Sequence, residues 1–134
     1  MRIESISALD AIDIRHRILW PDKPKEHSVV EGDDLAQHLG VFNGQTLVGV
    51  ASLFEDEGTV RLRKFAVDTQ FQGKGFGSAL LKHAIDTVQR MGVSLFWCDA
   101  RENAIGIYEH HGMTVEGERF YKSDIPYFRM SLSF

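Results

Sequence analysis

Seven consecutive residues carry the strongest chemical pattern in this sequence, Gln72-Gly73-Lys74-Gly75-Phe76-Gly77-Ser78. Glycines lack side chains and adopt unusual backbone angles, so successive amide N–H groups can converge on one point. A strand pattern ending in Phe65-Ala66-Val67 precedes the segment and a helical pattern follows it. Because a helix start adds unpaired amides and a partial positive charge, the segment is predicted to bind an anion. Side-chain donors are available from Gln72, Lys74 and Ser78.

The identity of the anion depends on the spacing of the glycines. The Gly-x-x-x-x-Gly-Lys-Ser/Thr spacing of a P-loop is absent. A dinucleotide fingerprint needs a third glycine where Ser78 stands, although Asp99 follows the next predicted strand, where a ribose-binding acid could lie. A nucleotide- or dinucleotide-binding loop therefore stays an alternative, and so does a glycine-rich turn that only starts a helix.

The same loop resembles the Gln/Arg-x-x-Gly-x-Gly/Ala pattern of the GNAT N-acetyltransferase superfamily. Gln72, Gly75 and Gly77 fill its three defining positions. What the resemblance implies is an acyl-CoA-dependent N-acetyltransferase that moves an acetyl group from acetyl-CoA to a primary amine by direct attack in a ternary complex.

A second segment, Asn103 to Met113, is similar to the family's Asn-x-x-Ala-x-x-x-Tyr-x-x-x-Gly-Phe pattern. Tyr108 and Gly112 keep the family's mutual spacing, whereas Ala104 follows Asn103 directly and Met113 replaces the phenylalanine. Because of this shift, Asn103 is either a cofactor contact or only the N-cap of a helix, where asparagine is favoured.

The resemblance also implies which residues hold the cofactor. The backbone of Phe65 to Val67 would pair with the pantetheine arm as an added strand, and one amide would polarise the thioester carbonyl. The expected cofactor contacts are Phe65, Ala66, Val67, Gln72, Gly73, Lys74, Gly75, Phe76, Gly77, Ser78 and Asn103.

Tyr108 is the expected catalytic acid, which protonates the departing thiolate. A phenol of pKa about 10 gives its proton to a thiolate of pKa about 8.5 only if the site lowers its pKa or solvates the thiolate poorly. The plainer interpretation is a tyrosine that packs on the inner face of its helix. The general base stays open among a candidate N-cap, a candidate core histidine and two turn carboxylates, namely Asp99, His38, Glu55 and Glu57.

The remaining reactive residues point to plainer roles. Cys98 lies in a hydrophobic strand pattern without a neighbouring histidine, which favours a buried thiol over a nucleophile. The six histidines lack a metal-binding frame, so no metal is expected. The acidic cluster Glu31 to Asp34 either attracts the acceptor amine, whose identity the sequence leaves open, or is a solvated surface. A CoA-binding module without catalytic activity is a further alternative.

Periodicity predicts the elements that position these groups. Helices are expected at Leu9–Trp20, Asp34–Leu39, Phe76–Met91 and from about Asp99–Asn103 to His111, with a type I′ hairpin turn at Asn43-Gly44. Strands are expected at Arg2–Ser5, Val41–Phe42, Leu47–Ala51, Thr59–Val67, Val93–Cys98, Thr114–Val115 and Tyr127–Leu132. The predicted fold is α+β, a GNAT-like mixed, mostly antiparallel twisted sheet of about six to seven strands. It has helices on both faces and a splay between the fourth and fifth strands.

Composition is that of an ordinary globular domain. The 134 residues fit one domain, 1–134, with 43% hydrophobic residues and a formal net charge of -4. This charge argues against a nucleic-acid partner, which usually needs a clustered basic face. The single cysteine excludes an intrachain disulfide, and no hydrophobic run approaches the roughly 20 residues that span a bilayer. A cytoplasmic protein without membrane contact is expected, and a homodimer is left open.

Overall fold

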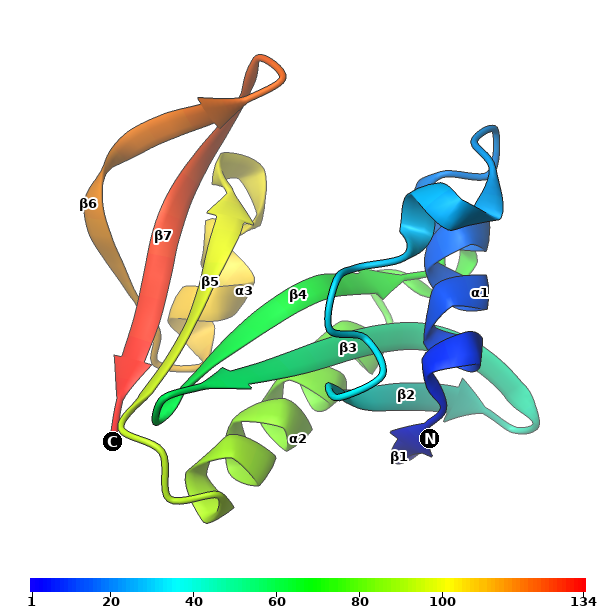
Figure 1. The fold of residues 1–134 in the computed structure, drawn as a ribbon, viewed down its shortest axis with the longest axis horizontal. Coiled ribbons are helices and arrows are strands. Elements are labelled where there is room, and N and C mark those ends of the chain that lie inside the picture. Colours follow the sequence, from blue (N-terminus) through cyan, green and yellow to red (C-terminus); the bar gives the residue numbers. More distant parts are fainter.

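Seven strands form one mixed sheet in the order β1-β2-β3-β4-β5-β7-β6, and the computed structural model describes all residues from 1 to 134 (Figure 1). The strands are β1 Arg2–Ile6, β2 Gln37–Asn43, β3 Thr46–Asp56, β4 Thr59–Val67, β5 Leu95–Arg101, β6 Thr114–Lys122 and β7 Ile125–Ser133. The helices are α1 Ala8–Leu19, α2 Phe76–Arg90 and α3 Ile105–His110, with 3₁₀ turns at Lys25–Ser28, Thr69–Phe71 and Glu102–Ala104. Only β4 and β5 pair in parallel, so the predicted α+β fold with a mostly antiparallel sheet is confirmed.

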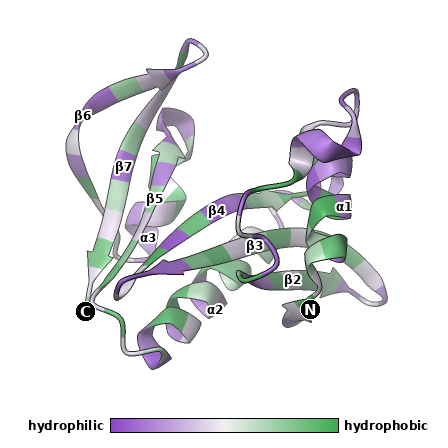
Figure 2. Ribbon diagram, in the orientation of Figure 1, coloured by the Kyte–Doolittle hydropathy of each residue, from purple (hydrophilic) through white to green (hydrophobic).

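Hydrophobic residues cover both faces of the sheet. On one face α2 packs Leu80, Leu81, Ala84 and Val88 into the main core with β2 to β5. On the other face Ala11 and Ile14 of α1 pack against β3 and β4. Figure 2 shows this distribution, with hydrophobic segments in β3 and α2 and a more hydrophilic β6. No helix combines the length and the hydrophobicity that a membrane crossing requires.

The sheet opens between β4 and β5. Thr59 pairs with Leu95, Val60 with Phe96 and Arg61 with Trp97, and the pairing stops there. From Leu62 to Val67 the β5-facing edge of β4 has no partner strand, while β5 continues along β7 as far as Arg101. Figure 1 shows the two strands diverging into a V, which is the predicted splay.

A β-bulge lies in β4 within the opening. Ser52 pairs with Arg63 and Val50 pairs with Ala66, so one residue of β3 faces both Lys64 and Phe65. Lys64 has a positive φ of 57°, which is uncommon for a residue with a side chain. Because side chains alternate along a strand, this extra residue reverses which face the following side chains occupy.

The consequence of the bulge is visible in the two cores. Before it, Val60 and Leu62 belong to the α2 side; after it, Phe65 packs on the α2 side and Ala66 packs under α1. Arg61 and Arg63, which alternate with Val60 and Leu62, therefore project from the face opposite α2.

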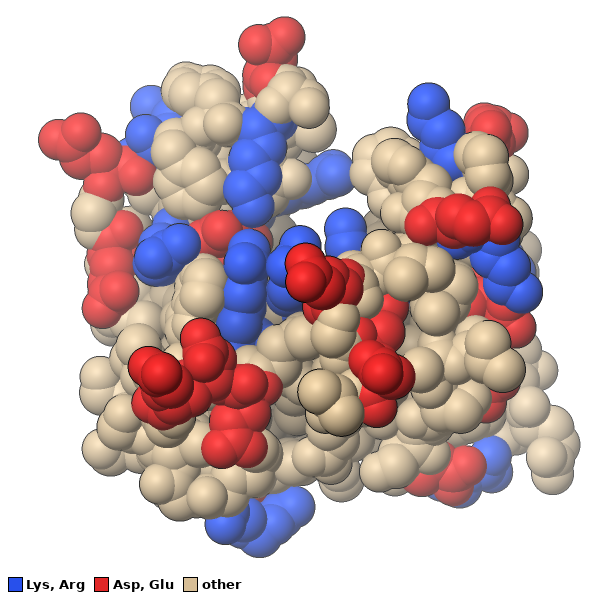
Figure 3. Space-filling model, in the orientation of Figure 1, with Lys and Arg blue, Asp and Glu red and all other residues tan.

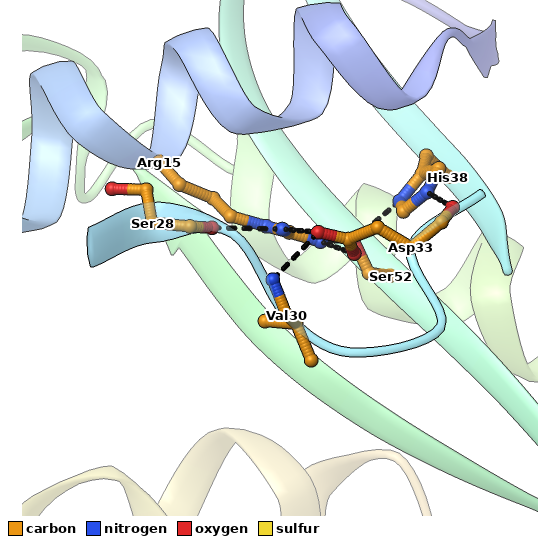
Figure 4. Close-up of polar contacts among 6 residues, drawn as sticks. All are labelled: Arg15, Ser28, Val30, Asp33, His38 and Ser52. Atoms are coloured by element: carbon orange, nitrogen blue, oxygen red, sulfur yellow. Dashed lines mark hydrogen bonds and ion pairs between the residues drawn. The ribbon is translucent and has the colours of Figure 1, made fainter. Parts of the chain in front are cut away.

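A buried polar network fixes the segment between α1 and β2 (Figure 4). The Arg15 guanidinium donates to both carboxylate oxygens of Asp33 at 2.8 and 2.9 Å, to Ser52 Oγ at 2.7 Å and to the Ser28 carbonyl at 3.1 Å. The Val30 N–H donates to the same carboxylate at 2.7 Å. Arg15 is 0% exposed and Asp33 6%, so Asp33 is neither a solvated surface residue nor free to attract an amine.

The helix predicted at Asp34–Leu39 is wrong. Turns end at Ala36, and β2 begins at Gln37, because Leu39 and Val41 pair in the sheet between β1 and β3. His38 on this strand holds the polar network, with Nδ1 at 2.8 Å from Ser52 Oγ and Nε2 at 2.8 Å from the Asp33 carbonyl.

The predicted hairpin turn also needs correction. Asn43 pairs with Thr46, so the central residues are Gly44 and Gln45, and of these only Gly44 has a positive φ, 60°. The type I′ geometry, with two positive φ values, occurs at Glu57-Gly58 between β3 and β4.

Candidate acetyl-transfer site

A cavity of about 770 Å³ occupies the space where β4 and β5 separate. β4 lines it from Arg61 to Val67, and β5 contributes Cys98, Asp99 and Arg101. The glycine loop forms one end, α3 contributes Ile107 and Tyr108, and the end of α1 contributes Ile18 and Leu19. The splayed strands therefore enclose a site that combines an unpaired strand edge with the loop.

The loop offers a set of free backbone donors. None of the amides from Gly73 to Ser78 donates to a protein acceptor; the first intrahelical bond runs from the Ala79 N–H to the Gly75 carbonyl at 3.1 Å. Gly73 and Gly75 have φ values of 74° and 90°, which side chains would strain. No side chain caps α2, so its first amides remain available to an anion.

Gln72 and Gly77 lie against the end of β4. The Gln72 side-chain amide donates to the Val67 carbonyl at 2.9 Å and ties the loop to the end of β4. A Cβ on Gly77 would lie 3.5 Å from Val67 and 3.7 Å from Phe65 and Ile107, which is ordinary van der Waals contact, so a methyl group fits there.

Most of the cofactor contacts expected from the sequence line this one cavity: Phe65, Ala66, Val67, Gln72, Gly73, Gly75, Gly77 and Ser78. Lys74, Phe76 and Asn103 do not line it. Phe76 is buried against Phe71, with ring centroids 5.7 Å apart. The alternative role of Asn103 as an N-cap is wrong, because it lies inside a 3₁₀ turn and makes no capping bond.

Tyr108 lies deep in the cavity wall. Its side chain is 7% exposed, and its ring is 6.1 Å from that of Phe65 in an edge-to-face contact. Burial, with a smaller effect of Cys98, raises the pKa of the Tyr108 phenol well above its ordinary value. The phenol therefore keeps its proton at any physiological pH.

Family membership follows from comparison of this chain with known proteins. Residues 21–134 match the family model of the acetyltransferase (GNAT) domain. The chain belongs to the GNAT acetyltransferase family. It is 35% identical over 135 residues to the uncharacterized N-acetyltransferase YitI of Bacillus subtilis, an alignment that covers 94% of this chain and 89% of YitI. The predicted enzyme class, N-acetyltransferase, is thereby confirmed.

Solved structures share the GNAT fold of this chain. The ribosomal-protein-S18-alanine N-acetyltransferase of Escherichia coli superposes with a TM-score of 0.80 at 23% identity, covering 98% of this chain and 92% of that one. A Bacillus subtilis acetyltransferase solved in complex with CoA superposes with a TM-score of 0.77 at 21% identity, covering 99% and 98%.

Among the candidate bases of this GNAT protein, only Asp99 lines the cavity. Its carboxylate accepts from Arg61 and Lys122 at 3.2 Å each and from Arg129 at 3.3 Å. His38 lies in the buried network outside the cavity, where its Nε2 faces a carbonyl and so carries the hydrogen. Glu55 and Glu57 are exposed near the β3–β4 turn and do not line the cavity.

Cys98 is a buried thiol of the cavity wall. Burial, helped by the charge of Asp99, raises its pKa to about 12, so the thiol is protonated and a poor nucleophile. No group of three or more His, Cys, Asp or Glu side chains lies close enough to hold a metal ion.

Sequence reasoning missed two features of the site. His111 Nε2 lies 2.8 Å from Ser78 Oγ and joins the end of α3 to the first turn of α2. Basic side chains gather at the end of the cavity away from the loop. The sequence indicates them by the run Arg61-Leu62-Arg63-Lys64, in which Arg61 and Arg63 flank the core residue of a strand.

Proposed function

We propose that this GNAT protein transfers the acetyl group of acetyl-CoA to a primary amine by direct attack within a ternary complex. The observation that carries the proposal is the joining, in one cavity, of an unpaired strand edge and a loop of free amides. An extended chain with an anionic end fits this combination, because the strand edge supplies main-chain hydrogen bonds and the loop supplies anion donors.

The cofactor contacts follow from these donors. The amides from Gly73 to Ser78 would hold the pyrophosphate, and the free edge of Phe65 to Val67 would pair with the pantetheine arm. Acetyl-CoA, when bound, supplies the activated thioester. A β4 amide at the bulge would donate to the thioester oxygen as charge develops on it. The side chains of Lys74, Phe76 and Asn103 act at most indirectly, since these residues do not line the cavity.

Tyr108 is proposed as the group that protonates the departing thiolate. Its high pKa rules out a lowered phenol pKa as the driving force. Poor solvation of the leaving thiolate can take its place. The Cys98 thiol on the same wall shows this effect, since burial raises its pKa to about 12. A thiolate that leaves into this wall meets a similar penalty, so a protonated phenol beside it remains a suitable donor.

The test is release of CoA thiol with a panel of amines, together with the variant Tyr108→Phe. We expect kcat to fall by about 10²-fold or more, in line with loss of a general acid, while acetyl-CoA affinity changes little. Tyr121→Phe, which removes an exposed phenol of β6, is the matched control and should keep full activity. Full kcat in Tyr108→Phe would refute the role of Tyr108. No thiol release with any amine would refute the proposed transfer.

Ligand specificity separates this proposal from the dinucleotide alternative. Asp99, the residue that alternative would place on a ribose, is instead held by three cationic side chains. Acetyl-CoA and CoA should therefore raise the melting temperature, whereas NAD and ATP at equal concentration should not.

A further inference from the structure

The end of the cavity away from the glycine loop is strongly basic. Five cationic side chains line the cavity against one carboxylate, that of Asp99; they are Arg61, Arg63, Lys64, Arg101 and Lys122. The whole chain has a formal net charge of -4, so this concentration of positive charge is local. Figure 3 shows Lys and Arg side chains gathered around the hollow between the two halves of the sheet.

The single carboxylate is already neutralised. Asp99 is 8% exposed and accepts from Arg61, Lys122 and Arg129. The Arg61 guanidinium also stacks on the Trp97 ring, 4.6 Å from its centroid, which fixes its position. Asp99 is therefore a support for these cations and not a free partner for an incoming ammonium group.

Three cavity cations remain without a hydrogen-bond acceptor in the protein: Arg63, Lys64 and Arg101. The Arg63 guanidinium lies over the Phe54 ring, 6.0 Å from its centroid. Lys64 stands at the bulge, and burial together with the charges of Arg63, Arg15, Lys122 and Arg61 lowers its pKa. All four charges that act on Lys64 are positive, so they repel it, and a bound anion would relieve the repulsion.

These cations are distant from the anion site of the loop. Along β4 the chain from Arg63 to Val67 spans about 13 Å at roughly 3.3 Å per residue, and the loop begins beyond Val67. The bulge, at which Lys64 stands, lies between Arg63 and the loop. A cofactor whose pyrophosphate occupies the loop and whose thioester lies at the bulge would leave Arg63 and its neighbours to face the acceptor.

We propose that the acceptor is a small amine that also carries an anionic group, a carboxylate or a phosphate, and that Arg63, Lys64 and Arg101 bind this group. The inference rests on the proposed transfer reaction and names its substrate class. The bound anion compensates the unpaired cations and fixes the amine in orientation. Polyamines and other acceptors with extra positive charge are repelled from the same end of the cavity.

The experiment compares matched acceptors that differ only in the anion. The pairs are alanine and alanine amide, 4-aminobutanoate and 4-aminobutanamide, and phosphoethanolamine and ethanolamine. In the preferred pair, kcat/KM should be at least about tenfold higher for the anionic member. The carboxylate and phosphate pairs distinguish the two sources of charge. Equal or lower kcat/KM for the anionic member in every pair would overturn the proposal.

Charge-removing variants locate the effect. In Arg63→Gln and Lys64→Gln the preference for the anionic member should fall about fivefold or more, mainly through KM. Arg90→Gln, at the exposed end of α2, is the matched control and should keep the preference. In the unmodified protein the preference should shrink between low and high salt, which tests the charge effect without any variant. A preference that both variants and salt leave unchanged would overturn the assignment.

A binding measurement separates this proposal from the transfer reaction itself. N-acetylalanine and its amide are titrated by calorimetry into the protein with CoA present. At least about tenfold tighter binding of the acid supports the anion site even if no amine is acetylated. Equal binding overturns the anion site. Thiol release only with amines that lack an anionic group would still support acetyl transfer.

Discussion

At the scale of single residues, the site depends on backbone donors more than on reactive side chains. The amides from Gly73 to Ser78 are free because the loop turns through the left-handed region at Gly73 and Gly75. The side chains at the reacting end are protonated and buried, as with Tyr108 and Cys98. Substitutions that disturb the backbone should therefore affect cofactor binding, whereas loss of the phenol should affect turnover.

Two of the three glycines of the loop, Gly75 and Gly77, should respond differently to substitution by alanine. Gly75→Ala places a side chain at φ 90°, which costs about 1–2 kcal/mol and shifts the amides. We expect acetyl-CoA affinity to fall about tenfold. Gly77→Ala keeps a helical φ, and its methyl group would meet neighbours only at 3.5–3.7 Å, so affinity should change less. Calorimetry on both variants tests the difference, and equal losses would argue against the loop geometry described here.

At the scale of elements, the opening depends on how β4 and α1 are held. The bulge at Lys64 reverses the side-chain faces of β4, so that Arg63 projects away from α2 and Phe65 projects toward it. The pair Arg15–Asp33 ties α1 and the following segment to Ser52 of β3. The buried pair thus holds α1, whose last residues Ile18 and Leu19 line the cavity, against the sheet.

Removing one partner of this pair should be more harmful than removing both. Asp33→Asn leaves the 0% exposed Arg15 without its counter-charge, and such losses cost about 3–5 kcal/mol. The double variant Arg15→Met with Asp33→Asn removes the unpaired charge and should recover part of that stability. Denaturant unfolding of both variants measures this order; a double variant less stable than Asp33→Asn would contradict it.

The same pair predicts a pH dependence of stability. Burial raises the pKa of the Asp33 carboxyl, but the hydrogen bonds from Arg15 and Val30 and the Arg15 charge outweigh it, so the pKa lies below its ordinary value. A carboxyl group whose pKa is lowered on folding contributes its full stabilisation above the unfolded pKa of about 3.9. This stabilisation is lost as the pH falls through the pKa of the folded state.

The melting temperature of the unmodified protein should therefore fall more steeply below about pH 4 than that of the double variant, which lacks the pair. Parallel melting temperatures across this range would show that Asp33 does not contribute. Thermal denaturation from pH 7 to pH 3 provides the measurement.

Sequence patterns predicted the elements whose periodicity is strong. Strand β4 was predicted with its observed bounds, and helix α2 within one residue, because each alternates or repeats over a long stretch. The helix predicted at Asp34–Leu39 was wrong because Asp33 and His38 form hydrogen bonds with residues of α1 and β3, which no local pattern reveals. The splay came from the family resemblance, and the basic end of the cavity was missed because it needs β4, β5 and β6 together.

At the scale of the whole molecule, the sheet acts as two halves joined by three parallel pairs of residues. One half consists of β1 to β4, and the other consists of β5, β7 and β6. The cavity is the space between them, with the loop at one end. The cationic side chains of Arg61, Arg63, Lys64, Arg101 and Lys122 lie away from the loop. A bound cofactor would bridge both halves and stabilise the molecule by mass action.

Amide hydrogen exchange with and without acetyl-CoA tests the central claim most directly, because the claim concerns backbone donors. We predict that acetyl-CoA slows exchange of the free amides between Gly73 and Ser78 and along the unpaired edge from Phe65 to Val67, with little change in β1 or β6. Exchange in these two segments that acetyl-CoA leaves unaltered, or protection confined to another part of the chain, would contradict the assignment of the cavity as the acetyl-transfer site.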